Sequence, residues 1–261
     1  MNFMSEFTKK ITSSTINYKV LGIIFALTIV YQISLYLVDP DEFNVPEALY
    51  LAGIFACAVS AFIVAKRYRG SEVFSKAYLF LGLAFVSWFI GDVGYVYYDH
   101  VLQLDPYPNP FDVGFAISYL FASLHLVLNT RYFRPQWNIE MKIVLVTLPL
   151  VMLVGYSLIA YAVWGDYDEL SFDIIYGNLF AVGATIELAL AILGAVVFRR
   201  SILKEVWLLL VIGIFIWTIG DVWYAFAEVF ETFDNTHPTN TLWMLSFMIV
   251  IYALYKHRKV I

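Results

Sequence analysis

The chain has 261 residues, of which 61% are hydrophobic and 14% are charged, and its formal net charge is −5. An ordinary globular domain carries about 25% charged residues, and here the apolar residues fall in runs of the roughly 20 residues that cross a bilayer as a helix. The composition therefore excludes a soluble globular protein and indicates an integral membrane protein. Because the only cysteine is Cys57, it also excludes an intramolecular disulfide.

Eight apolar runs predict eight transmembrane helices, over residues 20–38, 46–66, 74–98, 111–129, 141–163, 173–198, 204–228 and 240–256. The first run follows Lys9, Lys10 and Lys19, as in a signal peptide, but it has no small-residue cleavage site, so we expect a retained span. We expect no kinase or cyclase domain after the last span. We predict an all-α integral membrane fold in three parts: a cytoplasmic N-terminal segment and two parallel four-helix repeats, over residues 1–19, 20–134 and 135–261.

Basic and acidic residues lie in alternate connections, which predicts the orientation of the protein. All sixteen Lys and Arg residues fall on one side, at the termini and in three connections that contain Lys66, Arg67, Arg69 and Lys76, then Arg131, Arg134 and Lys142, then Arg199, Arg200 and Lys204. The opposite connections contain Asp39, Asp41, Glu42 and Glu47, then Asp99 and Asp105, then Asp166, Asp168 and Glu169, then Glu231 and Asp234. Because basic residues favour the cytoplasmic side, we expect a multi-pass protein of the cell membrane with both termini in the cytoplasm and with anionic lipids at its basic rim.

Two of the predicted helices carry the same pattern of aromatic and acidic residues, at steps of 4, 3 and 4 residues. The first set is Trp88, Asp92, Tyr95 and Asp99, and the second is Trp217, Asp221, Tyr224 and Glu228. In a helix these steps place all four side chains on one face. The likeness continues into the next spans, where Pro110 and Ser118 correspond to Pro238 and Ser246. It predicts two halves related by an axis along the membrane normal, with ligand sites where the halves meet.

Asp92 and Asp221 are the central candidates for a functional role. Each lies about 9 Å below the outer end of its helix at 1.5 Å per residue, and no Lys or Arg lies at that depth in any span. An ionised carboxylate there is costly, so each must be hydrogen-bonded, hydrated or protonated, and two that lie close together would share a proton. The structural alternative is that each bonds a Trp or Tyr of an adjacent helix. Gly91 and Gly220, directly before the two acids, should let a neighbouring helix approach closely.

Three other features are weaker candidates. Glu187 lies near the middle of the sixth span and has no counterpart in the second. We expect it to be neutral at pH 7 and to handle protons or bind a head group, the alternative being a hydrogen bond between helices. Asp112 and Asn240 open the fourth and eighth spans, where N-caps are expected. His125 is a lone histidine, which we expect to be a bonded core residue.

The sequence predicts no metal, no cofactor and no nucleic-acid partner. His100 and His237 lie in acidic connections, but their spacing matches no metal-binding motif. No intramembrane lysine is present for a retinal Schiff base, and no glycine-rich phosphate loop appears. The basic residues are topological flanks of the spans.

The first half contains Gly91-Asp92, Tyr95 and Asp99, then a proline-rich turn over residues 106–110, then Asp112 and Ser118-Tyr119. This pattern resembles the multi-span membrane sensor regions that precede diguanylate-cyclase or histidine-kinase domains in prokaryotic proteins. The second half matches more loosely, through Gly220-Asp221, Trp223 and Glu228. The resemblance implies a sensor of a ligand, here without an output domain of its own.

Asp92 follows a glycine in the third span and Asp221 follows one in the seventh. This placement is similar to that in lysoplasmalogenase-like membrane proteins, which also have eight spans and two intramembrane aspartates. In that family the second dipeptide is Ser-Asp, and its histidine–tyrosine element on span four has no clear match here. The resemblance implies that Asp92 and Asp221 act as general acid and base on a vinyl-ether lysolipid, with water as the nucleophile.

We expect a binding module that senses or holds a lipid or other apolar ligand near the outer leaflet and acts on a cytoplasmic or membrane signalling partner. The predicted ligand-binding residues are Trp88, Asp92, Tyr95, Glu187, Trp217, Asp221 and Tyr224. The alternative is a membrane lipid hydrolase in which Asp92 and Asp221 are catalytic. A third hypothesis is a proton-coupled transporter, based on Glu187 and the repeat. Membrane lipids are expected partners in each case.

Overall fold

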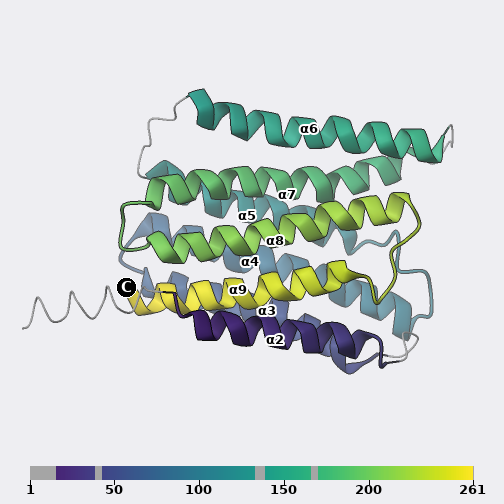
Figure 1. The fold of residues 1–261 in the computed structure, drawn as a ribbon, viewed down its shortest axis with the longest axis horizontal. Coiled ribbons are helices and arrows are strands. Elements are labelled where there is room, and N and C mark those ends of the chain that lie inside the picture. The colour runs from purple at the N-terminus through teal and green to yellow at the C-terminus, as the bar shows by residue number, and fades with distance from the viewer. Residues whose placement is uncertain (1–15, 39–42, 133–138, 166–169, 261) are drawn as a thin grey trace, which may run out of the picture.

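The computed structural model describes residues 16–38, 43–132, 139–165 and 170–260, and the regular structure in these ranges is entirely helical (Figure 1). The main helices are α2 (Tyr18–Leu35), α3 (Val45–Arg67), α4 (Glu72–Val96), α5 (Asp112–Tyr132), α6 (Ile139–Trp164), α7 (Leu170–Phe198), α8 (Lys204–Val229) and α9 (Pro238–Val260). A π-helical turn, η1 (Tyr97–Val101), continues α4. These eight helices are long and apolar enough to cross a membrane. An all-helical, multi-pass membrane fold is therefore confirmed, with helix ends within four residues of the predicted spans.

Several predictions of charge placement concern residues outside the described ranges, namely Lys9, Lys10, Asp39, Asp41, Glu42, Arg134, Asp166, Asp168 and Glu169. The predicted N-terminal segment is described only from residue 16. There the amide of Ile16 donates to the Glu205 carboxylate, and the amide of Asn17 donates to the Tyr252 hydroxyl at 2.8 Å. The start of α2 is thus tied to α8 and α9.

Six helices form a closed ring in the order α3, α4, α5, α7, α8, α9, because each packs against the next and α9 packs against α3. Figure 1 shows the ring as two layers, with α7, α8 and α9 in front of α5, α4 and α3. In this order α4 and α8 lie opposite each other. These are the two helices that carry the predicted aromatic and acidic stripes.

Helices α2 and α6 lie outside the ring, at opposite edges of the bundle (Figure 1). α2 packs on α9 and α3, whereas α6 packs on α7 and α8. Only 17% of the apolar window of each is buried, against 61% in α7 and α9. The large apolar side chains that α2 and α6 expose suit contact with lipid rather than water.

Helix α3 begins with a capping box. The Asn44 side chain accepts from the Glu47 amide at 3.1 Å, and the Glu47 carboxylate accepts from the Asn44 amide at 3.2 Å. Pro46 occupies the first turn, where a missing amide proton costs nothing. The local sequence therefore fixes where α3 begins.

The prediction that Asp112 caps α5 is wrong, because Asn109 has that role. Its Oδ1 accepts from the amide of Phe111 at 2.7 Å, and Asp112, already within the helix, accepts from the amide of Asn109 at 2.8 Å. Asn240 is likewise inside α9 and donates to the Asn235 carbonyl at 3.0 Å. The prolines at positions 110 and 238 thus mark the helix starts, but the polar residues that follow them are not the caps.

The two glycines before the aspartates do admit neighbouring helices, as expected. A Cβ at Gly91 would lie 2.7 Å from the ring of Phe115 on α5, and one at Gly220 would lie 2.8 Å from the indole nitrogen of Trp243 on α9. Each glycine therefore receives an aromatic ring from the following helix. The two rings differ chemically, since only the indole carries a hydrogen-bond donor.

Replacing Gly114 with Ala should destabilise the protein by about 1–3 kcal/mol, as overpacking does elsewhere. The added methyl group would lie 2.6 Å from the carbonyl oxygen of Ser87, a backbone atom of α4 that cannot move alone. The measurement is the midpoint of thermal unfolding in detergent. Gly155→Ala on α6 is the matched control, because nothing lies within 4 Å of its added methyl group. Equal midpoints for the two variants would contradict the close approach of α4 and α5.

Candidate functional site

A cavity of about 650 Å³ lies at the end of the bundle where α4 leads into η1. We call it the acidic chamber, because its walls carry Glu47, Asp92, Asp99, Asp105, Asp173, Glu228 and Glu231. Seven tyrosines also line it: Tyr31, Tyr50, Tyr95, Tyr107, Tyr156, Tyr176 and Tyr224. None of the described residues that line the chamber is a Lys, Arg or His. The chamber thus combines negative charge with aromatic walls.

The stripe on α4 faces this chamber along its whole length. Trp88, Asp92, Tyr95 and Asp99 all line it, since the 4, 3 and 4 spacing keeps them on one face of the helix. The stripe on α8 is divided. Its Tyr224 and Glu228 line the acidic chamber, whereas Trp217 lines a different cavity and Asp221 lines neither.

Asp221 is held by two hydrogen bonds from other helices and is 0% exposed. The hydroxyl of Tyr119 on α5 donates to its Oδ2 at 2.7 Å, and the indole N–H of Trp243 on α9 donates to its Oδ1 at 2.7 Å. This is the arrangement that the structural alternative describes. Asp221 joins α5, α8 and α9 at one point.

Asp92 has different surroundings, although its local sequence is almost the same. It is partly exposed to the acidic chamber, and its buried Oδ2 has no hydrogen-bond partner among the described residues. The indole nitrogen of Trp88, one turn earlier, also lacks a partner within the described part of the chain. Unpaired buried polar groups cost about 1–3 kcal/mol each. Both atoms are buried, and the Trp88 side chain lies near enough to interact with the Asp92 carboxyl group. A donor and an acceptor with unmet hydrogen bonds therefore lie next to the chamber, which both residues line.

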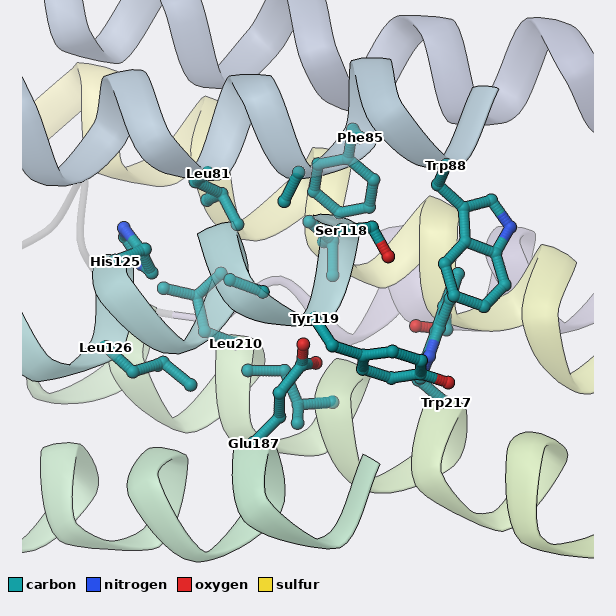
Figure 2. Close-up of a pocket in the computed structure, with 15 residues that line it drawn as sticks. Leu81, Phe85, Trp88, Ser118, Tyr119, His125, Leu126, Glu187, Leu210 and Trp217 are labelled. Atoms are coloured by element: carbon teal, nitrogen blue, oxygen red, sulfur yellow. The ribbon is translucent and has the colours of Figure 1, made fainter. Parts of the chain in front are cut away.

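Trp88 and Trp217 meet across the ring, with centroids 4.4 Å apart and planes at 75°. Both are buried, with Trp88 only 4% exposed. On the far side of this pair lies an inner cavity of about 60 Å³, which Trp88 lines as well. In Figure 2 this inner cavity runs from the two tryptophans to His125 and Leu126. The tryptophan pair thus separates two compartments of the bundle.

Glu187 on α7 lines the inner cavity together with Tyr119, the donor to Asp221. It is 8% exposed, and it makes no hydrogen bond to any described residue. Figure 2 shows its carboxyl group pointing into the middle of the cavity beside Tyr119. The alternative of a satisfied bond between helices therefore does not describe Glu187.

A chain of hydroxyl groups braces the acidic chamber and was missed by sequence reasoning. The Tyr95 and Tyr176 hydroxyls lie 3.0 Å apart, and Tyr176 donates to Oδ1 of Asp112 at 3.0 Å. The Tyr107 hydroxyl donates to Asp173 at 2.6 Å. Burial, reinforced by Asp173, raises the pKa of Tyr107 and keeps it a neutral donor. These bonds join α4, α5 and α7 over large sequence distances, so no local sequence pattern predicts them.

His125 is a bonded core residue, as expected, since its Nδ1 lies 2.8 Å from the carbonyl oxygen of Ala77. It is not isolated, because Tyr78 packs between it and His257, with centroids 4.9 and 4.8 Å away. His257 bonds the Tyr68 hydroxyl at 2.8 Å. This buried aromatic layer closes the bundle at its basic end.

The two histidines of the outer connections, His100 and His237, have different partners. His100 Nε2 lies 3.1 Å from both carboxylate oxygens of Glu47, which joins the end of α4 to the start of α3. His237 contacts Thr239 instead. Within the ranges that the structure describes, no three His, Cys, Asp or Glu side chains are grouped to hold a metal ion.

Asp221→Ala should be more destabilising than Asp92→Ala. Removing Asp221 leaves the Tyr119 hydroxyl and the Trp243 N–H buried without acceptors, at about 1–3 kcal/mol for each group. Removing Asp92 strands no such pair of donors. The measurement is the midpoint of thermal unfolding of the two variants in the same detergent. If Asp92→Ala lowered the unfolding midpoint as much as Asp221→Ala does, Asp92 would have a structural role.

Comparison with known proteins adds no relative from which a role could be carried over. No protein-family model, no curated protein and no solved structure matches this chain. The function has to be argued from the chemistry of the acidic chamber and the inner cavity.

Proposed function

We propose that this membrane protein binds an amphiphile with a cationic head group, such as an amine-bearing lipid, in the acidic chamber. The observation that carries the proposal is the lining of the chamber. Among the described residues it presents seven acidic and seven tyrosine side chains and no basic one, and an oxygen of Asp92 has no hydrogen-bond partner there. The proposal narrows the lipid or apolar ligand expected from the sequence to one class of head group.

The charge of the chamber favours a cation. A cleft lined by one sign of charge with low-dielectric walls concentrates ions of the opposite sign. Tyrosine and tryptophan rings add attraction for ammonium groups placed over their faces, of about 0.5–2 kcal/mol. Some of the acids have partners, such as Glu47 with His100 and Asp173 with Tyr107. Asp92 is the deepest of the lining acids along α4 and is the best placed to anchor the head group.

The size and walls of the chamber suit an amphiphile. Its volume of about 650 Å³ falls within the roughly 300–1,000 Å³ of small-molecule sites. Leu35 and Val38 at the end of α2, with Trp164 at the end of α6, give it apolar walls next to the lipid-facing helices. A head group can therefore bind near Asp92 while its chain lies towards the bilayer.

The predicted repeat explains why Asp92 and Asp221 differ. Matching Pro110 to Pro238 gives an offset of 128 residues (238 − 110). Under that offset the two donors of Asp221, Trp243 and Tyr119, correspond to Phe115 and Phe247, and phenylalanine has no donor. The ring also pairs its helices in the order that a two-fold axis requires, with α3 on α9 matching α7 on α5. We infer that one half keeps a structural aspartate and the other keeps a free one.

A lipid hydrolase is the second candidate, because an unpaired carboxylate on a chamber wall is also what a general acid or base requires. The Asp92 oxygen that has no hydrogen-bond partner among the described residues favours the hydrolase. Asp221, with both oxygens bonded and no access to the acidic chamber, does not fit the second catalytic role. We therefore rank binding above hydrolysis.

The opposite end of the bundle is basic and suits an anionic surface or partner. Lys66, Arg67, Arg69, Arg258 and Lys259 line a shallow hollow of about 530 Å³ between the ends of α3 and α9. Under the positive-inside rule this end faces the cytoplasm. We propose that a signalling partner binds this basic surface and responds when the acidic chamber is occupied.

The head-group proposal is tested with dodecyltrimethylammonium and dodecanol, which share a chain and differ in charge. Binding to protein in neutral-lipid nanodiscs is followed by tryptophan fluorescence, since Trp88, Trp164 and Trp243 line the chamber. We expect dodecyltrimethylammonium to bind about tenfold more tightly than dodecanol, a difference of about 1.4 kcal/mol in binding free energy. Asp92→Asn should weaken the binding of dodecyltrimethylammonium by about the same factor. The matched control is Asp234→Asn, an exposed acid outside the chamber lining.

Equal affinities for the two probes, or equal losses in the two variants, would contradict the head-group proposal. Release of a fatty aldehyde from a vinyl-ether lysolipid, abolished by Asp92→Asn, would favour the hydrolase instead.

The orientation is tested by labelling single cysteines in intact cells. Cys57 is fully buried and can be replaced to give a cysteine-free background. With both termini in the cytoplasm, Asp105→Cys should react with a membrane-impermeant maleimide from outside, and Lys259→Cys should react only after the cells are opened. The reverse pattern would overturn the predicted orientation.

A further inference from the structure

Of the described residues, Glu187 is the only acid that lines the inner cavity, and it does not line the acidic chamber. It is 8% exposed, it has no hydrogen-bond partner among the described residues, and its carboxyl group points into the cavity (Figure 2). A carboxyl group within a transmembrane helix is costly and usually marks an ion or proton pathway. A purely structural acid would instead be bonded, as Asp221 is.

The inner cavity has room for water next to Glu187. A water molecule needs about 10–15 Å³ of this kind of volume and 2–4 polar partners, and the cavity offers about 60 Å³. The hydroxyl groups of Ser118 and Ser246 line it together with Glu187. Each serine already donates to a backbone carbonyl, so its oxygen is open as an acceptor. Water between these groups could carry a proton to or from the carboxylate.

The groups that face Glu187 include no permanent cation among the described residues. Tyr119 and His125 of α5 line the same cavity, and Asp221 of α8 is near enough to interact electrostatically with Glu187. The residues that α4 and α9 contribute to the lining, which include Trp88 and Ser246, carry no charged or titratable side chain. Within the described part of the chain, no Lys or Arg that could neutralise Glu187 by an ion pair lines the cavity. A proton is therefore the cation that fits this site.

The two ends of the inner cavity differ in how they are closed. At the basic end the side chains of His125, Leu126, Trp207 and His257 are each 1–2% exposed, and Trp207 stacks on Phe198 at 4.4 Å. At the other end Trp88 lines both the inner cavity and the acidic chamber. Trp88, packed on Trp217, therefore separates Glu187 from the chamber, whereas a layer of fully buried side chains separates it from the basic end.

We propose that Glu187 is a proton-binding site that exchanges with the acidic chamber past Trp88. The carboxylate takes a proton from hydronium, which becomes water, and the carboxylic acid returns it to water in the reverse step. No other reactant is required. This site lies outside the amphiphile site of the chamber, and neither depends on the other being correct.

The proposal is tested by infrared spectroscopy of the full chain in nanodiscs. Wild-type protein should show a carboxylic C=O stretching band that grows as the pH falls, shifts to lower frequency in D2O, and is lost in Glu187→Gln. Asp92→Asn and Asp221→Asn are the controls and should keep this band. If Glu187→Gln does not fold, Glu187→Asp should move the band instead, and the D2O shift of wild-type protein needs no variant.

The route is tested by the rate at which the Glu187 band shifts after mixing with D2O. Trp88→Ala should speed the shift several-fold, because it opens the wall to the chamber. Leu126→Ala truncates the cavity wall at the other end and should leave the rate near that of wild-type protein. A Glu187 band that does not titrate, or that does not shift in D2O, would overturn the proton site. Faster exchange in Leu126→Ala than in Trp88→Ala would overturn the route.

Discussion

Trp88 and Trp217 meet edge to face at the centre of a ring of six helices, 4.4 Å apart. Each is the first residue of an aromatic and acidic stripe, and their helices lie opposite each other in the ring. The contact fills the middle of the bundle at one level and leaves space on both sides of it. The wide, acidic compartment and the narrow, apolar one both depend on this contact, and so does their separation.

The two aspartates show how neighbours, rather than local sequence, decide what a buried acid does. Both follow a glycine, and both glycines lie under an aromatic ring from the next helix. Over Gly220 that ring is an indole, which donates to Asp221. Over Gly91 it is the phenyl ring of Phe115, which has nothing to donate. Asp221 is thereby bonded to neighbouring helices. Asp92 instead lines the acidic chamber, and its Oδ2 has no hydrogen-bond partner among the described residues.

Sequence patterns predict the parts of this structure that depend on local periodicity. Long apolar runs locate all eight helices, and helical spacing places Trp88, Asp92 and Tyr95 on one face, where the structure has them. The closure of the ring, with α3 against α9 and α5 against α7, depends on packing between distant segments and has no such pattern. The bonds from Tyr119 to Asp221 and from Tyr176 to Asp112 arise from that packing. For the same reason Asp92 and Asp221 look alike in sequence and differ in surroundings.

The peripheral position of α2 and α6 bears on how the acidic chamber is bounded. Its inner wall belongs to α4 and to helices of the closed ring, whose positions are held by neighbours on both sides. Part of its outer wall comes from Tyr31 and Leu35 of α2 and from Tyr156 and Trp164 of α6, two helices with most of their surface outside the protein core. Elements with few buried contacts are the easiest to displace. The surrounding bilayer, by its thickness and lateral pressure, therefore helps to set the dimensions of the chamber from outside the polypeptide.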